Sequence, residues 1–129
     1  METITVLVAD DNDSFRQTIS KLFALEDDIQ MVAEAKDGLD VVKKASDLVP
    51  NIVLLDLMMP EKNGIEAANL IKKEHPDIVI AILTVLDDVW QRAQAARAGV
   101  DAYILKDTPF DQLVQKIKRL VGDTKTRTK

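Results

Sequence analysis

Short apolar runs alternate with longer amphipathic stretches along almost the whole chain. The runs are four to seven residues long, as in strands buried on both faces, and they are Ile4–Ala9, Ile29–Ala35, Ile52–Leu55, Ile78–Leu83 and Ala102–Leu105. Each run is followed by a stretch in which apolar residues recur at helical spacing. The pattern therefore predicts five strands, each followed by a helix.

The last amphipathic stretch gives the clearest helical pattern, with a stripe of Phe110, Leu113, Val114, Ile117, Leu120 and Val121. Thr108 can cap this helix and Pro109 suits its first position. In the fourth stretch, Val89, Ala93 and Ala96 form the apolar stripe, so we expect Trp90 beside it to be partly exposed. Gly99 follows this stretch, where a helix should end.

Five strand–helix units predict an α/β fold in which a doubly wound parallel sheet is covered on both faces. Right-handed crossovers place every strand-to-helix loop at the same edge of such a sheet. The 129 residues suit one domain. We expect this domain to span residues 1–122 and to be followed by a flexible polar tail at 123–129.

Composition narrows the classes of function. The chain has no cysteine, so it can form neither a disulfide framework nor a thiolate metal site. Its start does not resemble a signal peptide, and no apolar run is long enough to span a bilayer, so we expect a cytoplasmic protein without membrane contact. The net charge of -5 argues against direct nucleic-acid binding by this domain.

Three acids fall at the carboxyl ends of predicted strands. Asp10 and Asp11 follow the first strand, and Asp56 follows the third. Open α/β sheets bind their ligands at this edge, and grouped buried carboxylates require a cation. Oxygen ligands without nearby His or Cys favour Mg²⁺ or a similar hard ion such as Mn²⁺. Alternatively, acids here only start the first helix, which we favour for Asp13.

Two donors follow other strands directly: Thr84 ends the fourth and Lys106 ends the fifth. With a divalent cation, a hydroxyl and an ammonium group supply the hydrogen bonds and positive charge that a phosphoryl group requires. A carboxylate nucleophile, a metal and a lysine together predict a site of phosphoryl transfer.

The segments that carry these residues resemble the receiver domain of two-component response regulators. The resemblance covers residues 4 to about 121 and rests on five separated motifs, which are VLVADD at 6–11, LDLMMP at 55–60, Gly64, Leu83-Thr84 and AYILK at 102–106. The run Lys106-Asp107-Thr108-Pro109 resembles the NarL/FixJ-type subgroup. The resemblance implies a flavodoxin-like fold with strand order 2-1-3-4-5.

It also implies a role for each matching residue. Asp56 would accept the phosphoryl group from a sensor histidine kinase or a small phosphodonor. Asp11, Asp56 and the backbone carbonyl of Met58 would bind Mg²⁺ directly, and Asp10 would act through water. As for the donors, Lys106 would pair first with Asp56 and then with the phosphoryl group, Thr84 would turn inward, and Tyr103 would follow it.

Further expectations concern the partners of the domain. Phosphorylation would reshape the surface formed by the fourth helix, fifth strand and fifth helix, and so control an output, with transcription the expected one. NarL/FixJ-type receivers usually precede a LuxR-type DNA-binding domain, which would be fused or separate here. Homodimerisation through this surface or another one stays open.

Three other functions share parts of this pattern. A phosphohydrolase of the haloacid-dehalogenase type would need an acid two residues after the nucleophile, where Met58 stands. A flavodoxin-type flavin binder would need a phosphate-binding loop after the first strand, where acids stand instead. The third is a receiver-fold interaction module that is not phosphorylated, against which the complete set of acids, Thr84 and Lys106 argue. As a receiver, the domain would catalyse only its own phosphorylation and dephosphorylation and would not be an enzyme.

Overall fold

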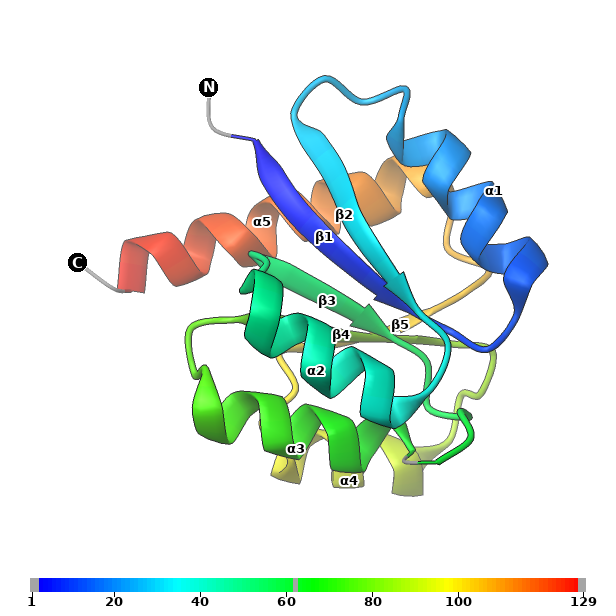
Figure 1. Ribbon diagram of the computed structural model, residues 1–129, viewed down its shortest axis with the longest axis vertical. Helices are drawn as coiled ribbons and strands as arrows, with labels where there is room; N and C mark the ends of the chain where they lie inside the picture. Colours follow the sequence, from blue (N-terminus) through cyan, green and yellow to red (C-terminus); the bar gives the residue numbers. More distant parts are fainter. Residues whose placement is uncertain (1–2, 62, 128–129) are drawn as a thin grey trace.

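The apolar runs form one parallel sheet in a computed structural model that describes the backbone of residues 3–61 and 63–127 and side chains as far as Gly122. Its strands are β1 (Ile4–Ala9), β2 (Ile29–Ala35), β3 (Ile52–Leu55), β4 (Val79–Thr84) and β5 (Ala102–Leu105). They lie in the order β2-β1-β3-β4-β5 (Figure 1). This confirms the predicted doubly wound sheet and its strand order.

The boundaries of β4 differ slightly from the prediction. The amide of Ile78 donates to the carbonyl of His75 in a turn, so Ile78 precedes the strand. At the other end, Thr84 pairs with Leu105 of β5. Thr84 is therefore the last residue of the strand and is held by the sheet itself.

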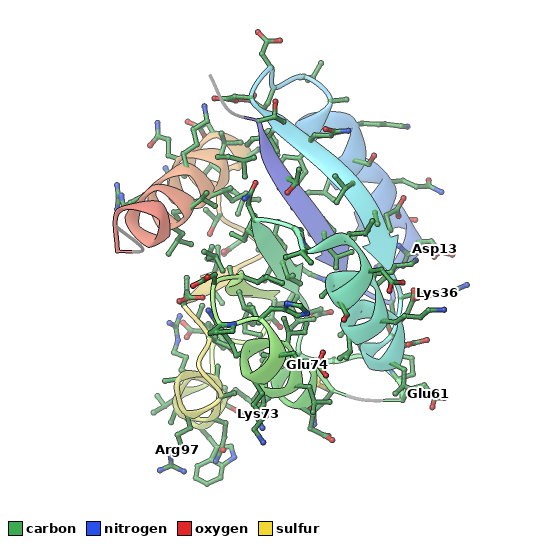
Figure 2. All side chains as sticks on the ribbon, turned by 60° about the vertical axis from the view of Figure 1, so that its left-hand side comes forward. Asp13, Lys36, Glu61, Lys73, Glu74 and Arg97 are labelled. Carbon is green, nitrogen blue, oxygen red and sulfur yellow. The ribbon has the colours of Figure 1, made fainter. Side chains whose placement is uncertain are left out.

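Five helices cover the two faces of the sheet (Figure 1). They are α1 (Asp13–Phe23), α2 (Gly38–Leu48), α3 (Gly64–Glu74), α4 (Val89–Arg97) and α5 (Phe110–Arg127). The first and last helices lie on one face, and α2, α3 and α4 lie on the other. Charged side chains such as Lys73, Glu74 and Arg97 point away from the sheet (Figure 2).

Neighbouring residues of each strand belong to different apolar cores. Val6 and Val8 pack in the core beneath α1 and α5, whereas Leu7 and Ala9 pack in the core beneath α2 and α3. The alternation continues in β3 and β4 because side chains on a strand point to opposite faces in turn. The sheet thus separates two apolar cores, one on each face.

Short polar side chains fix the starts of the helices near that edge. Asn12, Asp37, Asn63 and Asp88 each accept a hydrogen bond from a backbone amide in the first turn of the following helix. Such caps stabilise a helix by about 1 kcal/mol each. Asp13 is the first residue of α1, as expected for an acid that complements the helix dipole, although Asn12 is the cap.

The predicted buried face of α4 is wrong. Val89 is 84% exposed and Ala93 and Ala96 are exposed, while Ala95 is the one residue of α4 that is buried. This helix offers the sheet a narrow contact made by a small side chain, and its larger apolar residues face outward. The expected exposure of Trp90 is confirmed, since 65% of the residue is accessible.

The end of α5 also differs from expectation. The backbone of residues 123–127, expected as part of a flexible polar tail, continues α5 as far as Arg127, and residues 128–129 lie outside the described part. No proline follows Gly122, and Lys and Arg favour helix, so the last apolar turn can extend into polar sequence. The domain boundary at residue 122 stays a prediction.

Candidate functional site

The carboxyl edge of the sheet brings three acids together. One carboxylate oxygen from each of Asp10, Asp11 and Asp56 lies within 4.8 Å of the other two. Asp10 follows β1 and Asp56 follows β3, which are adjacent parallel strands. Their proximity is therefore a direct result of the topology that the sequence predicts.

Sheet hydrogen bonds hold the backbone of two of these acids. The amide of Asp10 donates to the Ala35 carbonyl, and the amide of Asp56 donates to the Ala9 carbonyl, both at 2.9 Å. Asp10 is 2% exposed and Asp56 is 7% exposed, whereas Asp11 is exposed. The cluster thus has a buried floor formed by two acids and one acid at its mouth.

Lys106 reaches this floor from the end of β5. Its Nζ lies 2.6 Å from Asp10 Oδ2 and 3.5 Å from Asp56 Oδ2. The ammonium group also lies 4.3 Å from the centre of the Phe15 ring, a cation–π contact from α1. The sequence led us to expect a pair with Asp56, but in this structure Lys106 is closer to Asp10.

One lysine does not neutralise the acids that surround it. Burial raises the pKa of Asp56, and the negative charge of Asp10 raises it further, while Lys106, the Thr84 hydroxyl and the Met58 amide act in the opposite direction. The direction of the shift means that the ionised form of Asp56 is under-stabilised here. An additional cation at this edge would remove that deficit.

The residues fit a hard divalent cation. Asp10 Oδ2 is buried and accepts no hydrogen bond within the described part of the chain, its contact with Lys106 being an ion pair without hydrogen-bond geometry. Carboxylate oxygens grouped without nitrogen or sulfur ligands suit Mg²⁺ or Mn²⁺.

Thr84 and Tyr103 lie on adjacent strands beside the acids. Thr84 is fully buried, and its hydroxyl accepts a 3.4 Å hydrogen bond from the Leu86 amide. The Tyr103 hydroxyl donates to the Leu86 carbonyl at 2.6 Å, and the Arg92 guanidinium lies 4.5 Å from the centre of its ring. Both side chains are therefore connected to the segment between β4 and α4.

Gly64 lies against the segment that follows β3 and carries Asp56. A Cβ atom built on this residue would lie 2.3 Å from the backbone carbonyl oxygen of Asp56. The amide of Gly64 also donates to the Leu57 carbonyl at 3.0 Å. The start of α3 can approach the segment after β3 this closely only because residue 64 has no side chain.

The sequence predicted the acids, Thr84 and Lys106 but missed Arg16. Arg16 is 9% exposed, and its Nη1 donates to the Asp10 carbonyl at 2.5 Å. A signal was available, because Arg16 shares the buried face of α1 with Ile19 and Phe23. A lone charged residue on an apolar helix face requires partners.

Comparison with known proteins identifies the fold family. A family model described as "Response regulator receiver domain" matches residues 6–118. The chain is 36% identical over 116 residues to the response regulator protein VraR of Staphylococcus saprophyticus, and 33% identical over 114 residues to the transcriptional regulatory protein LnrK of Bacillus subtilis. These alignments cover 90% and 88% of this chain and 56% and 52% of the relatives. The chain thus spans about half the length of these two relatives.

A solved structure agrees with this comparison. The LuxR-family DNA-binding response regulator from Staphylococcus aureus superimposes with a TM-score of 0.86 at 31% identity, covering 92% of this chain and 98% of that one. The chain belongs to the receiver domains of two-component response regulators, and its relatives are of the NarL/FixJ type.

Proposed function

We propose that this domain accepts a phosphoryl group on the carboxylate of Asp56, from the phosphohistidine of a sensor histidine kinase or from a small phosphodonor. One observation carries the proposal, namely the convergence of Asp10, Asp11 and Asp56 at the strand ends beneath the ammonium group of Lys106. A hydroxyl at Thr84 on the adjacent strand completes the set.

Mg²⁺ or Mn²⁺ would be held directly by Asp11, Asp56 and the backbone carbonyl of Met58, with Asp10 acting through water. The ion supplies positive charge to the non-bridging oxygens of the phosphoryl group. Within the chain itself, Lys106 offers a mobile cation that now lies between two carboxylates.

In the transfer step, an oxygen of Asp56 forms a bond to phosphorus while the bond from phosphorus to the donor imidazole nitrogen breaks. The electron pair of that bond stays with the imidazole. Lys106 then exchanges its carboxylate contacts for the phosphoryl oxygens, and the Thr84 hydroxyl turns inward to donate to them.

The phosphoryl group adds about one and a half to two negative charges. Movement of Thr84 would release its hydrogen bond with the Leu86 amide. The Tyr103 hydroxyl donates to the carbonyl of Leu86, so the Tyr103 side chain would move inward with the segment between β4 and α4. The surface formed by α4, β5 and α5 would then change, which is the output of the switch.

We infer that the output is transcriptional, because relatives include a transcriptional regulatory protein and a LuxR-family DNA-binding response regulator. A fused or separate DNA-binding domain and a homodimer would be the partners of the switched surface. We also propose that the domain acts in the cytoplasm. Among the described residues, no helix is long and apolar enough to cross a bilayer.

Comparison with a phosphohydrolase favours a switch over a turnover enzyme. An aspartyl phosphohydrolase needs a proton donor two residues after the nucleophile, and here Met58, which is 62% exposed, stands at that position. A thioether cannot transfer a proton at neutral pH. We therefore expect self-phosphorylation and slow loss of the phosphoryl group, without turnover of phosphoesters.

The test is intact-mass analysis after incubation with Mg²⁺ and acetyl phosphate. We expect one added phosphoryl group on the wild-type chain, none on Asp56→Asn, and none when EDTA replaces the metal. Asp47→Asn, a matched change at an exposed position of α2, should gain the group as the wild type does. An adduct on Asp56→Asn, or none on the wild type, would contradict the proposal.

A further inference from the structure

One guanidinium group is buried beneath the loop that carries the acids. Arg16 lies in α1, and its side chain is 11% exposed. Its Nε donates to Glu34 Oε1 at 2.9 Å, its Nη2 donates to Asp13 Oδ1, and its Nη1 donates to the backbone carbonyl of Asp10 at 2.5 Å. A single side chain thus links α1, the end of β2 and the end of β1.

The contact with the Asp10 carbonyl is the one that concerns the site. This carbonyl belongs to the peptide that joins Asp10 to Asp11, so fixing it also fixes the direction in which Asp11 leaves the strand. On the other side of the peptide, the Asn12 amide donates to Asp10 Oδ1 at 2.9 Å. Both the backbone carbonyl and the side chain of Asp10 are therefore held by hydrogen bonds, and Asp11 lies between Asp10 and Asn12.

An ordinary ion pair between α1 and β2 would not need this arrangement. Glu34 has a side chain that is 43% exposed, and ion pairs with such exposed partners contribute little to stability. Burying a guanidinium group costs several kcal/mol unless each donor is paired. The buried part of Arg16 is directed at the acid loop, where a main-chain carbonyl receives it.

The partner Glu34 is itself restrained. The ammonium group of Lys44 on α2 donates to the backbone carbonyl of Glu34 at 2.5 Å and to Asp40 Oδ2 at 3.1 Å. The guanidinium group of Arg16 therefore pairs with a residue whose backbone is held by a lysine from the other face of the sheet. This gives the Asp10 carbonyl a rigid support.

We propose that Arg16 is a positioning residue of the metal site, which holds the Asp10–Asp11 peptide in the orientation that Mg²⁺ binding requires by bridging it to Glu34. The inference rests on the proposed function, since it assigns a second layer to the same site. Partners that orient metal ligands commonly change metal affinity by about tenfold or more when they are removed.

The planar shape of the Arg16 guanidinium group matters for this role as well as its positive charge. Three donors of one planar guanidinium reach three acceptors on different elements. A lysine keeps the charge but has no planar fork with which to reach them together. Arg16→Lys should therefore restore little of the metal affinity that Arg16→Ala loses.

Isothermal titration of the unphosphorylated chain with MgCl₂ measures this directly. We expect Arg16→Ala and Arg16→Lys to bind Mg²⁺ about tenfold more weakly than the wild type. Lys118→Ala breaks an ion pair between α5 and the segment before β2, far along the chain from the acids, and should bind Mg²⁺ like the wild type. All titrations are run where circular dichroism shows a folded chain.

A second readout separates positioning from general loss of structure. With acetyl phosphate, the Mg²⁺ concentration for half-maximal phosphorylation should rise in Arg16→Ala, while the rate at saturating Mg²⁺ returns near the wild-type value. If Arg16→Ala does not fold, Glu34→Ala removes the support and should weaken Mg²⁺ binding in the same direction. Where both single variants fold, the double variant should lose less Mg²⁺ affinity than the sum of the two single losses.

Mg²⁺ affinities of Arg16→Ala or Glu34→Ala equal to the wild type would overturn the inference. Full Mg²⁺ affinity in Arg16→Lys would overturn the requirement for the fork. Because the titration uses no phosphodonor, its result stands even if the wild-type chain fails to gain a phosphoryl group. Failure of the proposed function is therefore distinguishable from failure of this inference.

Discussion

At the scale of single residues, the site depends on how closely backbone segments approach one another. Gly64 illustrates this, because the carbonyl oxygen of Asp56 occupies the position that a Cβ atom would need. A side chain there would displace the segment that carries Asp56 or the start of α3. The glycine thus contributes to function without offering any functional group.

We predict that Gly64→Ala lowers the free energy of unfolding by about 1 to 3 kcal/mol, the usual cost of overpacking. The change acts against helix propensity, which favours Ala over Gly by about 1 kcal/mol. Urea denaturation of both forms, followed by circular dichroism, measures the difference.

Gly122→Ala is the matched control for this prediction. A Cβ atom at Gly122 would meet nothing within 4 Å, so the same substitution in α5 should leave stability unchanged or raise it. Equal effects of the two substitutions would show that the close approach to Asp56 is not what restricts residue 64.

Much of the site could be predicted from residues alone. Asp10, Asp11, Asp56, Thr84 and Lys106 each end a strand, and parallel topology brings strand ends together. What could not be predicted was how the lysine divides its contacts, because a shift of about one ångström along a flexible side chain decides between the two acids. The buried guanidinium of Arg16 was also missed, since its partners come from three separate segments.

At the scale of elements, α4 is the least firmly packed helix. Its buried contact is Ala95, and Val89 and Trp90 face outward. The side chain of Tyr103 provides a polar connection instead, through the Leu86 carbonyl and the Arg92 guanidinium. A helix held in this way can be shifted by small changes at its first turn.

The ionisation of Tyr103 reports on this connection. Burial raises the pKa of Tyr103, the Arg92 cation lowers it, and Asp88, Asp87 and Asp56 raise it. The folded chain should therefore keep the phenol proton to a higher pH than the unfolded chain, whose pKa is about 10, and stability should fall as pH rises beyond that value. The chain has one tyrosine, so the change of phenolate absorbance with pH measures this residue alone.

We predict that the midpoint of the phenolate titration lies above that of the chain unfolded in urea. Arg92→Ala should raise the midpoint further, whereas Arg97→Ala, at an exposed position later in the same helix, should not. A midpoint at or below that of the unfolded chain would contradict the arrangement around Tyr103.

The elements themselves were the most predictable part of the structure, because continuous apolar runs and helical patterns both follow directly from burial. The exceptions have physical causes. In α4 the helical spacing of Val89, Ala93 and Ala96 predicts a stripe that faces the core. The helix instead contacts the sheet through one small residue, so this stripe is exposed. At the end of α5, polarity suggested a tail although nothing in the sequence stops a helix.

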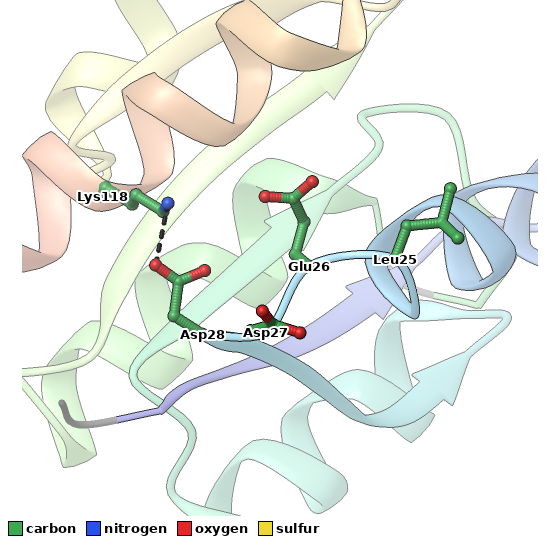
Figure 3. A pocket seen from close by; sticks show the side chains of 5 residues that line it. All are labelled: Leu25, Glu26, Asp27, Asp28 and Lys118. Atoms are coloured by element: carbon green, nitrogen blue, oxygen red, sulfur yellow. Dashed lines mark ion pairs between the residues drawn. The ribbon is translucent and has the colours of Figure 1, made fainter.

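At the scale of the whole molecule, ion pairs join elements that are distant in sequence. Asp28 precedes β2 and pairs with Lys118 of α5 at 2.8 Å, beside a pocket lined by Leu25, Glu26 and Asp27 (Figure 3). This pair ties the first half of the chain to the last helix at the end of the sheet opposite the acids.

The pair makes stability depend on acidity. The hydrogen bond from Lys118 lowers the pKa of Asp28 below that of the unfolded chain, about 3.9. The unfolded state then binds more protons between the two values, so the contribution of the pair is present above about pH 4 and is lost as pH falls through the lower value.

We predict that Asp28→Asn lowers the thermal midpoint at pH 7 and that its difference from the wild type shrinks in acid. Asp27→Asn removes the same charge from an exposed neighbour and should not show this pH-dependent difference. Calorimetric scans between neutral and acid pH provide the measurement. A constant difference across the range would mean that the ion pair does not contribute.

The two cores on either side of the sheet also bear on which changes in length the chain can accept. Both faces of β1 and β3 are mainly apolar, so hydrophobicity alone would tolerate either strand shifted by one position. Such a shift would turn Asp10 or Asp56 from one side of the sheet to the other and separate the carboxylates. Deletions or insertions within β1 and β3 should therefore be selected against by loss of signalling before they are selected against by loss of folding.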